Sequence, residues 1–365
     1  MMRTGVIYDP VYLEHETGEH PENSSRLSSI MSYLEESSLT SQLVPIAPRA
    51  ATIDELSLIH HISYIDYIRS ICDYGGKCID SDTIVSPHSY TAAIFAAGGA
   101  ITAAESVMEG NVDNAFALVR PPGHHATPRE AMGFCIFNNI AIAAKYIISK
   151  YGLERIAIID FDVHHCNGTQ IAFESKPEVL CVSIHQHPLF PGTGRIDETG
   201  SGKAMGTNVN IPLPPRCGDS EYELAFKQII VPVVKRYQPQ LILVSAGFDA
   251  HWADTISSMQ VSVKGFFRMM SIIKYLAEEE CNNRLAAVLE GGYHLDALRA
   301  SVKATFDVLI GNDYTKDPLG PSPYQSTREK PPDINYLIQR IQEVHRLTVE
   351  EPVSSQPVKA NSSQI

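Results

Sequence analysis

One short stretch of the chain concentrates side chains that bind metals and move protons. Asp160, Asp162, His164 and His165 follow directly after the apolar run 156–159. Because side chains alternate along an extended chain, Asp160, Asp162 and His164 are expected on one side of it. Carboxylate and imidazole groups gathered in this way are typical ligands of a divalent cation. The alternative is a polar helix N-cap, but a cap needs one such residue and not four.

Other apolar runs also end in groups that can do chemistry. His124 and His125 close the segment Arg-Pro-Pro-Gly-His-His, Asp249 ends another run, and Tyr293 follows a Gly-Gly pair. Three ligands of His and carboxylate type leave an open position on zinc, where a bound water has a pKa of about 7. Paired histidines supply acid–base groups, and a tyrosine can donate a hydrogen bond to a polarised carbonyl. These parts predict a metal-assisted hydrolase.

The elements that must position these groups are apolar runs of strand length alternating with helical patterns. Strands are predicted at 4–9, 114–119, 156–159, 179–185, 241–249 and 285–294, and helices at 26–35, 53–71, 89–109, 136–151, 221–237, 261–280 and 296–310. Continuous apolar strands alternating with helices predict an α/β fold: one domain with a mostly parallel central sheet and helices on both faces. The polar groups then meet at the carboxyl ends of the strands, where such sheets bind ligands.

Composition sets the class and the expected surroundings. The 365 residues are 44% hydrophobic and 19% charged, as in ordinary globular proteins. A formal net charge of −13 argues against direct nucleic-acid binding and mildly favours a basic substrate. The seven cysteines are odd in number and form no Cys-x-x-Cys pair, which favours a reducing compartment. No signal peptide or membrane span is recognised, so a cytoplasmic location without membrane association is expected.

The domain organisation is expected to have three parts. Residues 1–315 should form the catalytic domain, and 316–349 a C-terminal extension with one helix, at about 334–348, packed on it. Residues 350–365 are polar and are expected to form a disordered tail. Assembly into a homo-oligomer stays open.

Four motifs, in this order, carry a family resemblance. They are Arg-Pro-Pro-Gly-His-His-Ala, Asp-Phe-Asp-Val-His-His-Cys-Asn-Gly-Thr-Gln, Ser-Ala-Gly-Phe-Asp-Ala-His and Glu-Gly-Gly-Tyr. Together they resemble the zinc-dependent histone deacetylase superfamily over roughly residues 4–312. The resemblance is strongest to the class II-like branch, which includes histone deacetylase-like amidohydrolases and acetylpolyamine amidohydrolases. It implies an arginase/deacetylase-like fold and hydrolysis of an acetyl amide, such as ε-N-acetyl-lysine in proteins or a similar acetylated amine.

The resemblance also implies roles for individual residues. One catalytic zinc ion (Zn2+) would be bound by Asp162, His164 and Asp249. The catalytic groups would be His124, His125, Tyr293, Asp160 and Asn167. A structural potassium ion (K+) would lie among Asp160, Asp162, His164, Ser183 and Ile184. Gly133, Phe134 and Phe190 would line a narrow acyl-lysine tunnel, with Asp82 holding the substrate backbone at its rim. Arg26 matches an arginine near an internal acetate cavity.

The sequence departs from the family pattern at four positions. Cys166 replaces a usual glycine and Phe161 replaces a usual Trp or Leu; both should affect packing, and we expect Cys166 to be a buried, inert thiol. Asn167 stands where class I members carry an acid, so the pKa of His125 should stay near its ordinary value. Ile256 falls where polyamine-specific members carry a glutamate, which disfavours a cationic polyamine.

Two other functions compete with the deacetylase hypothesis. A binuclear manganese ureohydrolase would need a second acid two residues after Asp249, where His251 stands. A catalytically weak, acetyl-ligand-binding regulator would not need Tyr293 and both catalytic histidines. An acetylpolyamine or other small-amide amidohydrolase remains the nearest alternative, and a turnover assay separates all of them.

Overall fold

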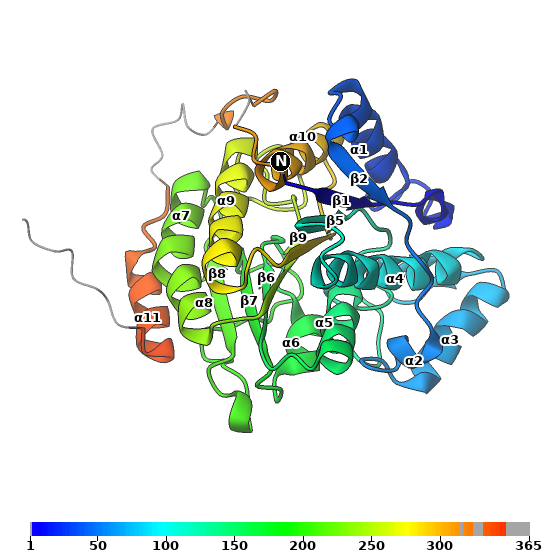
Figure 1. The fold of residues 1–365 in the computed structure, drawn as a ribbon, viewed down its shortest axis with the longest axis horizontal. Helices are drawn as coiled ribbons and strands as arrows, with labels where there is room; N and C mark the ends of the chain where they lie inside the picture. The colour runs from blue at the N-terminus through cyan, green and yellow to red at the C-terminus, as the bar shows by residue number, and fades with distance from the viewer. Residues whose placement is uncertain (1, 314–316, 324–330, 348–365) are drawn as a thin grey trace, which may run out of the picture.

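Eight parallel strands form the central sheet of the computed structural model (Figure 1). The structure describes residues 2–313, 317–323 and 331–347. The strands, in chain order, are β1 (Thr4–Ile7), β2 (Leu43–Ile46), β5 (Asn114–Ala117), β6 (Ile156–Asp160), β7 (Val179–Gln186), β8 (Asn208–Leu213), β9 (Leu241–Ala246) and β10 (Leu285–Leu289). Their order across the sheet is β2-β1-β5-β10-β9-β6-β7-β8. A separate antiparallel pair is formed by β3 (Lys77–Cys78) and β4 (Ile84–Val85).

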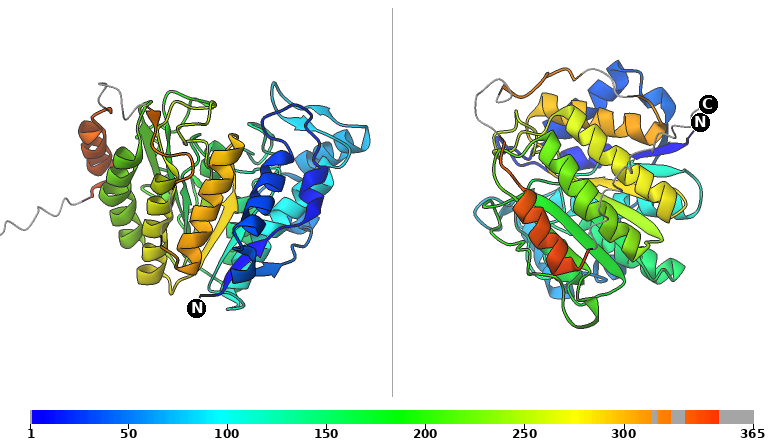
Figure 2. Two further views of the ribbon diagram at one scale, coloured as in Figure 1. Left: turned by 90° about the horizontal axis from the view of Figure 1, so that it is seen from above. Right: turned by 90° about the vertical axis from the view of Figure 1, so that its left-hand side faces the viewer.

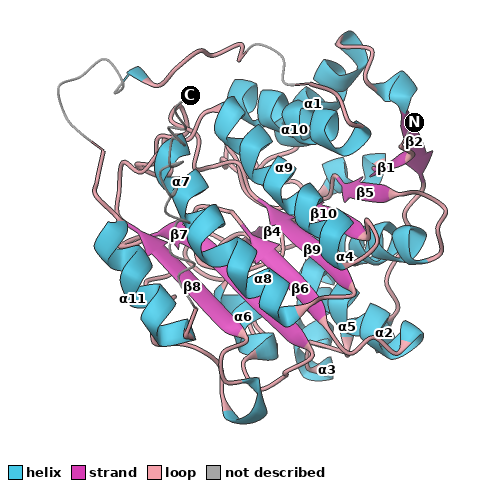
Figure 3. Cartoon of the chain, turned by 60° about the vertical axis from the view of Figure 1, so that its left-hand side comes forward, coloured by secondary structure: helices cyan, strands magenta, loops and turns pink. Residues whose placement is uncertain are grey.

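Helices cover both faces of this sheet. Those on one face, which contact each other in turn, are α1 (Ser25–Glu36), α10 (Leu295–Ile310), α9 (Val263–Glu280), α7 (Asp219–Ala225) and α8 (Val231–Tyr237). Those on the other are α2 (Ile53–Leu56), α3 (Ile62–Asp73), α4 (Ser89–Met108), α5 (Asn139–Tyr151) and α6 (Asn167–Phe173). Figure 3 shows α8 and α9 lying across the strands. The last helix, α11 (Asn335–His345), packs on the outside beside α7 and α8 (Figure 2).

The inner strands are apolar because both of their faces are covered. Every residue of β6, β9 and β10 is buried, so the two-sided apolar pattern correctly predicted a parallel sheet. The predicted α/β class, with helices on both faces, is confirmed by this architecture. The small residues of α4 allow close packing, since a Cβ added to Gly98 would lie 1.7 Å from the carbonyl oxygen of Arg49.

Besides the short pair β3 and β4, two strands of the central sheet were missed, and they are its two edges. β2 contains Pro45 and β8 contains Pro212, and the latter strand alternates asparagines with apolar residues. Proline cannot donate to a strand ladder and is confined to edge strands. The edge position therefore explains why these sequences do not look like strands.

Two predicted helices differ in detail from the structure, and one helix was not predicted. The expected helix 53–71 is two helices, because Thr52 caps α2 in a capping box and the chain turns again at His61 before α3. The short helix α6 directly after the predicted metal cluster was not predicted. Helix 221–237 contains a π-helical segment (Phe226–Ile230), which precedes Pro232 in the first turn of α8, where proline supplies no backbone N–H.

Helix α4 is also long and apolar enough to cross a membrane by length and composition. In the described part of the chain it is the one helix that passes this test, and 67% of its apolar window is buried inside the protein. The predicted helix of the C-terminal extension is present as α11. Residues 314–316, 324–330 and 348–365 lie outside the described residues, so the predicted boundary at 315/316, parts of the predicted extension and the whole predicted tail cannot be compared with the structure.

Candidate active site

The predicted metal ligands meet at the carboxyl ends of two neighbouring strands. Asp162 and His164 follow β6, and Asp249 follows β9, which pairs with β6. One ligand atom from each lies within 4.8 Å of the others, and all three residues are buried. His164 Nδ1 is 3.1 Å from Asp162 Oδ1 and 3.2 Å from Asp249 Oδ2. The side chains therefore converge on one point.

Two glycines make room for these carboxylates. A Cβ added to Gly247 would lie 2.0 Å from Asp162 Oδ2, and one added to Gly291 would lie 2.3 Å from Asp249 Oδ2. The backbone N–H of Gly291 also donates to Asp162 Oδ2 at 2.8 Å. Glycine is needed at both positions because any side chain would occupy the space of the carboxylate oxygens.

Asp249 has a raised pKa and one carboxylate oxygen without a donor, and both features are those of a metal ligand. Burial, together with the Asp162 carboxylate, raises the pKa of Asp249 to about 6. Asp249 Oδ1 accepts from the N–H of Val163 at 3.0 Å, whereas Oδ2 is buried and accepts no hydrogen bond from the described residues; its 3.2 Å contact with His164 has only ion-pair geometry. A buried carboxylate oxygen that is left without a donor, beside a second carboxylate and an imidazole, fits a metal ion.

The tandem histidines lie beside the cluster, each with a different partner. His124 Nδ1 is 3.0 Å from Asp160 Oδ2, and His125 Nδ1 is 2.7 Å from Asn167 Oδ1. Burial lowers the pKa of His124, but the nearby Asp160 and Asp162 carboxylates outweigh it and raise the pKa to about 10. Since an amide oxygen can only accept, the His125 proton sits on Nδ1 and leaves Nε2 free as a base.

The pKa expected for His125 was wrong. It is lowered well below its ordinary value of 6.5, first by burial and then by the positive charges of His124 and His164. The expectation considered only the missing carboxylate at Asn167. The hydrogen bond to Asn167 does favour the charged ring, but it is weaker than these opposing effects.

Tyr293 reaches the site on the loop after β10. Its backbone N–H donates to Asp254 Oδ2 at 2.6 Å, and its ring lies 5.0 Å from the guanidinium carbon of Arg26. Arg26 is buried and donates to the carbonyl oxygens of Glu290 and Gly292, at 2.5 and 2.7 Å. Burial raises the pKa of Tyr293 well above 10, so its hydroxyl stays protonated and can donate a hydrogen bond.

Comparison with known proteins places the chain in a family. The histone deacetylase domain family matches residues 20–309. The chain belongs to the histone deacetylase family. It is 43% identical over 298 residues to a probable deacetylase of Archaeoglobus fulgidus, with 81% of this chain and 82% of the relative covered. It is 37% identical to the histone deacetylase-like amidohydrolase of Pseudomonas aeruginosa, with 86% and 82% covered.

A solved structure gives the same result. The crystal structure of the HDA15 HD domain superposes with a TM-score of 0.83 at 33% identity, covering 94% of both chains. The predicted family, fold and enzyme class are therefore confirmed: the protein is a hydrolase that acts on an amide bond, and its family removes acetyl groups from acetylated amides.

Of the residues predicted to line the tunnel, Gly133 and Phe190 lie beside His125, and Phe134 lies beside Tyr293. The rings of Phe190 and His125 have centroids 5.1 Å apart, and those of Phe134 and Tyr293 are 5.7 Å apart. A Cβ on Gly133 would lie 2.5 Å from the His125 ring, and this residue and Phe134 both have positive φ values, of 54° and 68°. The four rings therefore form two edge-to-face pairs, one at the proposed base and one at Tyr293.

Asp82 lies on a loop next to this wall. The neighbouring Thr83 accepts a hydrogen bond from the N–H of Phe134 at 3.2 Å. Burial and the nearby Asp80 carboxylate raise the pKa of Asp82. The structure thus brings Asp82 near the tunnel residues, and its contact with a substrate backbone remains a prediction.

The residues predicted to bind potassium are neighbours across two paired strands. Asp160 of β6 lies opposite Ser183 of β7, and Ile184 is the next residue along β7. Asp160 Oδ1 also accepts from the N–H of Asp162 at 3.0 Å. The carboxylate therefore binds both His124 and the backbone that follows β6. His165, excluded from the predicted zinc ligands, instead contacts Thr193 and Gln170.

Sequence reasoning missed three acids that organise the site. Glu22 pairs with buried Arg120 and Arg26, Asp254 binds the Tyr293 backbone, and Glu290 binds the turn that carries His124. Only Glu290 belonged to a recognised motif, Glu-Gly-Gly-Tyr, so only it could have been noticed.

The structure agrees with the prediction for Cys166. All seven cysteines are free. Cys166 is buried 3.7 Å from Cys181, and this contact together with burial raises its pKa well above 9, which fits an inert thiol. His251 lies outside the three-ligand cluster and its Nδ1 accepts from the N–H of Ala253, an arrangement unlike a second metal ligand.

Proposed function

We propose that this protein is a zinc-dependent deacetylase that hydrolyses ε-N-acetyl-lysine in proteins or peptides. The observation that carries the proposal is the convergence of Asp162, His164 and Asp249 on one point beside His125. Two acids and one histidine match the ligand chemistry of a catalytic zinc site with an open position. A bound zinc ion there would polarise the acetyl carbonyl and lower the pKa of an attacking water.

His125 is proposed as the general base. Its Nδ1 proton is held by Asn167 at 2.7 Å, so Nε2 is the atom that can take a proton from the attacking water. Its lowered pKa keeps the ring neutral before reaction. The same Nε2 proton can then pass to the leaving amine. His124, paired with Asp160, adds positive charge close to the developing oxyanion.

Tyr293 is proposed to stabilise that oxyanion. Its hydroxyl remains protonated because burial raises its pKa, and the Asp254 and Arg26 contacts fix the loop that carries it. A preorganised donor aimed at a developing oxyanion contributes about a hundredfold or more in rate. The rings of Phe190, beside His125, and of Phe134, beside Tyr293, suit the apolar methylenes of a lysine side chain.

A protein or peptide substrate is favoured over an acetylated polyamine. Ile256 is apolar and lies in the segment where polyamine-specific relatives carry a glutamate, which mildly disfavours a cationic polyamine; its N–H donates to Asp254. A structural potassium ion among Asp160, Asp162, His164, Ser183 and Ile184 is part of the same proposal; the pairing of Asp160 with Ser183 supports it.

The test is acetate release by purified protein, after chelation and after reloading with zinc. We expect turnover of ε-N-acetyl-lysine peptides only with the metal bound, with kcat/KM exceeding that for N-acetylated polyamines by about tenfold or more. Faster turnover of the polyamines would replace the substrate assignment. Binding of the peptide without acetate release, in the zinc-loaded protein, would favour the regulator hypothesis instead.

A further inference from the structure

Glu290 is a buried acid at the centre of the site that has no part in the mechanism above. It follows β10 directly and extends the ladder, since its N–H donates to the carbonyl oxygen of Ala246 at 3.0 Å. Its side chain is fully buried. A buried carboxylate is costly unless several donors satisfy it, so its contacts indicate why the position is acidic.

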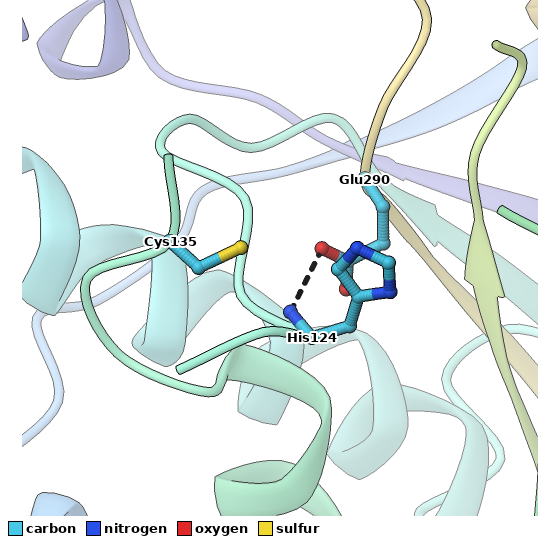
Figure 4. Close-up of side chains that lie close together, drawn as sticks. All are labelled: His124, Cys135 and Glu290. Atoms are coloured by element: carbon cyan, nitrogen blue, oxygen red, sulfur yellow. Dashed lines mark hydrogen bonds between the residues drawn. The ribbon is translucent and has the colours of Figure 1, made fainter. Parts of the chain in front are cut away.

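One oxygen of this carboxylate holds the turn that carries the tandem histidines. Glu290 Oε2 accepts from the backbone N–H groups of Gly123, at 2.7 Å, and His124, at 3.1 Å. Figure 4 shows the second of these bonds, with the carboxylate directed at the His124 backbone. Among the described residues, the hydrogen-bond partner of the other oxygen is the Ser245 hydroxyl, at the long distance of 3.4 Å. The acid therefore acts mainly through Oε2.

The same residue also anchors the tyrosine loop. Its carbonyl oxygen accepts from Arg26, and the next residue, Gly291, donates its N–H to the metal-ligand carboxylate of Asp162. Glu290 thus joins the histidine turn, the metal cluster and the start of the Gly-Gly-Tyr loop. These segments are far apart in sequence, and they must be placed within a fraction of an ångström for catalysis.

We propose that Glu290 is a positioning residue that sets the place of the tandem histidines by accepting the two backbone N–H groups of Gly123 and His124. The inference rests on the proposed function, because it concerns the same base and the same reaction. It predicts that kcat depends strongly on the location of this acceptor oxygen and only weakly on the negative charge of the side chain.

The contacts favour this role over a second metal site. His124, Cys135 and Glu290 do each offer a ligand atom within 4.8 Å of the others (Figure 4). However, Glu290 Oε2 is engaged by two amides, His124 Nδ1 by Asp160, and burial raises the pKa of the Cys135 thiol well above 9. Metal ligation that keeps these bonds would have to use Glu290 Oε1 and His124 Nε2, and it would need the thiol to be deprotonated.

Three substitutions separate position from charge. Glu290→Gln keeps an acceptor oxygen in place and removes the charge; Glu290→Asp keeps the charge and withdraws the oxygen by one methylene; Glu290→Met removes the acceptor with little change in volume. Ser245→Ala is the matched control, because it touches only the other oxygen. For each protein, kcat, KM, bound zinc and thermal unfolding are measured.

We expect Glu290→Gln and Ser245→Ala to stay within about threefold of the wild-type kcat. Glu290→Asp and Glu290→Met should lose about a hundredfold in kcat, the scale of an ångström-sized misplacement, with KM and zinc content nearly unchanged. Loss in Glu290→Gln with full activity in Glu290→Asp would overturn the proposal in favour of a charge effect. Wild-type kcat in Glu290→Asp and Glu290→Met would also overturn it.

The comparison still tests the proposal if one variant does not fold. Should Glu290→Met fail to fold, the Gln and Asp variants alone give the order that the proposal requires. The series is measured on whichever acetylated amine the wild-type enzyme hydrolyses. Failure of the acetyl-lysine assignment therefore shows in the wild-type protein, whereas failure of the positioning role shows only in the variants.

Discussion

At the scale of single residues, the pKa of His125 decides when it can act as a base. Asn167 faces its Nδ1 atom without supplying a negative charge. Asn167→Asp adds that charge at a buried position, which favours the protonated ring and raises the pKa of His125. Because the base must be neutral before reaction, the acidic limb of the kcat/KM profile should move to higher pH. A pH–rate comparison of the two proteins measures this, and a shift to lower pH would contradict the assignment of His125.

Tyr293 can be tested by removing one oxygen atom. Tyr293→Phe should reduce kcat by at least about a hundredfold, the scale of losing one oxyanion donor, with zinc content unchanged. Tyr222→Phe is the control: this tyrosine is also buried, and its hydroxyl has no hydrogen-bond partner among the described residues. Steady-state acetate release compares the two. Equal rates in both variants would remove Tyr293 from the catalytic groups.

His125 gives a second test at this scale. His125→Ala removes the proposed base and should lower turnover by at least about a hundredfold, within the usual contribution of acid–base catalysis. An alanine at His165 provides the comparison, because that ring contacts Thr193 and Gln170 instead of the metal cluster. Similar losses in both would point to a general packing defect and not to a proton-transfer role.

The sequence predicted the residues that bind the metal or react directly, and it missed those that hold a distant segment of backbone in place. Asp162, His164 and Asp249 converge as expected because each directly follows an apolar strand. Asp254 and Glu290 act instead on the backbone of segments 39 and 166 residues away. Such a bond depends on tertiary packing, which no local pattern records. The pKa of His125 was mispredicted for the same reason, since its main cause is burial.

At the scale of elements, inner strands and long helices could be predicted, and edges could not. The two-sided apolar patterns of β6 and β9 reflect burial on both faces, whereas the edge strands β2 and β8 tolerate proline and polar residues. The turns after the strands carry the site residues. Glycines in these turns let the turns approach one another closely.

Gly291 offers a direct test of this close approach. Gly291→Ala would place a Cβ 2.3 Å from Asp249 Oδ2, so the carboxylate must move and zinc affinity should fall by about tenfold or more. Gly110→Ala is the matched control, because no atom lies within 4 Å of its added Cβ and only its positive φ adds strain. Zinc dissociation constants by competition with a chelator measure the effect. Unchanged affinity in Gly291→Ala would contradict the assigned ligand set.

At the scale of the whole molecule, α11 is proposed to stabilise the catalytic domain without taking part in catalysis. Its residues Ile338 and Ile341 are buried, and the helix packs beside the π segment and α8 on the outer side. Deleting residues 331–365 should leave kcat/KM within about twofold and lower the melting temperature by several degrees, given roughly 2 kcal/mol for each buried isoleucine. A large loss of kcat at unchanged stability would assign the extension to the active site.

The metal cluster should also set the stability of the whole fold. A ligand that binds only the folded state stabilises it by about 4 kcal/mol at a thousand times its dissociation constant. Chelation should therefore lower the melting temperature, and added zinc should restore it. In the metal-free protein the pKa of Asp249 is about 6, above its ordinary value of 3.8. At a pH between these two pKa values, the folded state therefore binds more protons than the unfolded state.

The contribution of Asp249 to the stability of the metal-free protein should consequently fall as pH rises from about 4 to about 6. Asp249→Asn removes the repulsion with Asp162, so the metal-free variant should be more stable than the metal-free wild type at pH 7 and lose this part of the pH slope. It should also gain less from zinc, because a ligand is missing. Thermal unfolding at pH 4, 5, 6 and 7, with and without zinc, measures all three effects. A metal-free variant less stable than the metal-free wild type at pH 7 would show that the two carboxylates are balanced by the protein alone, without a cation.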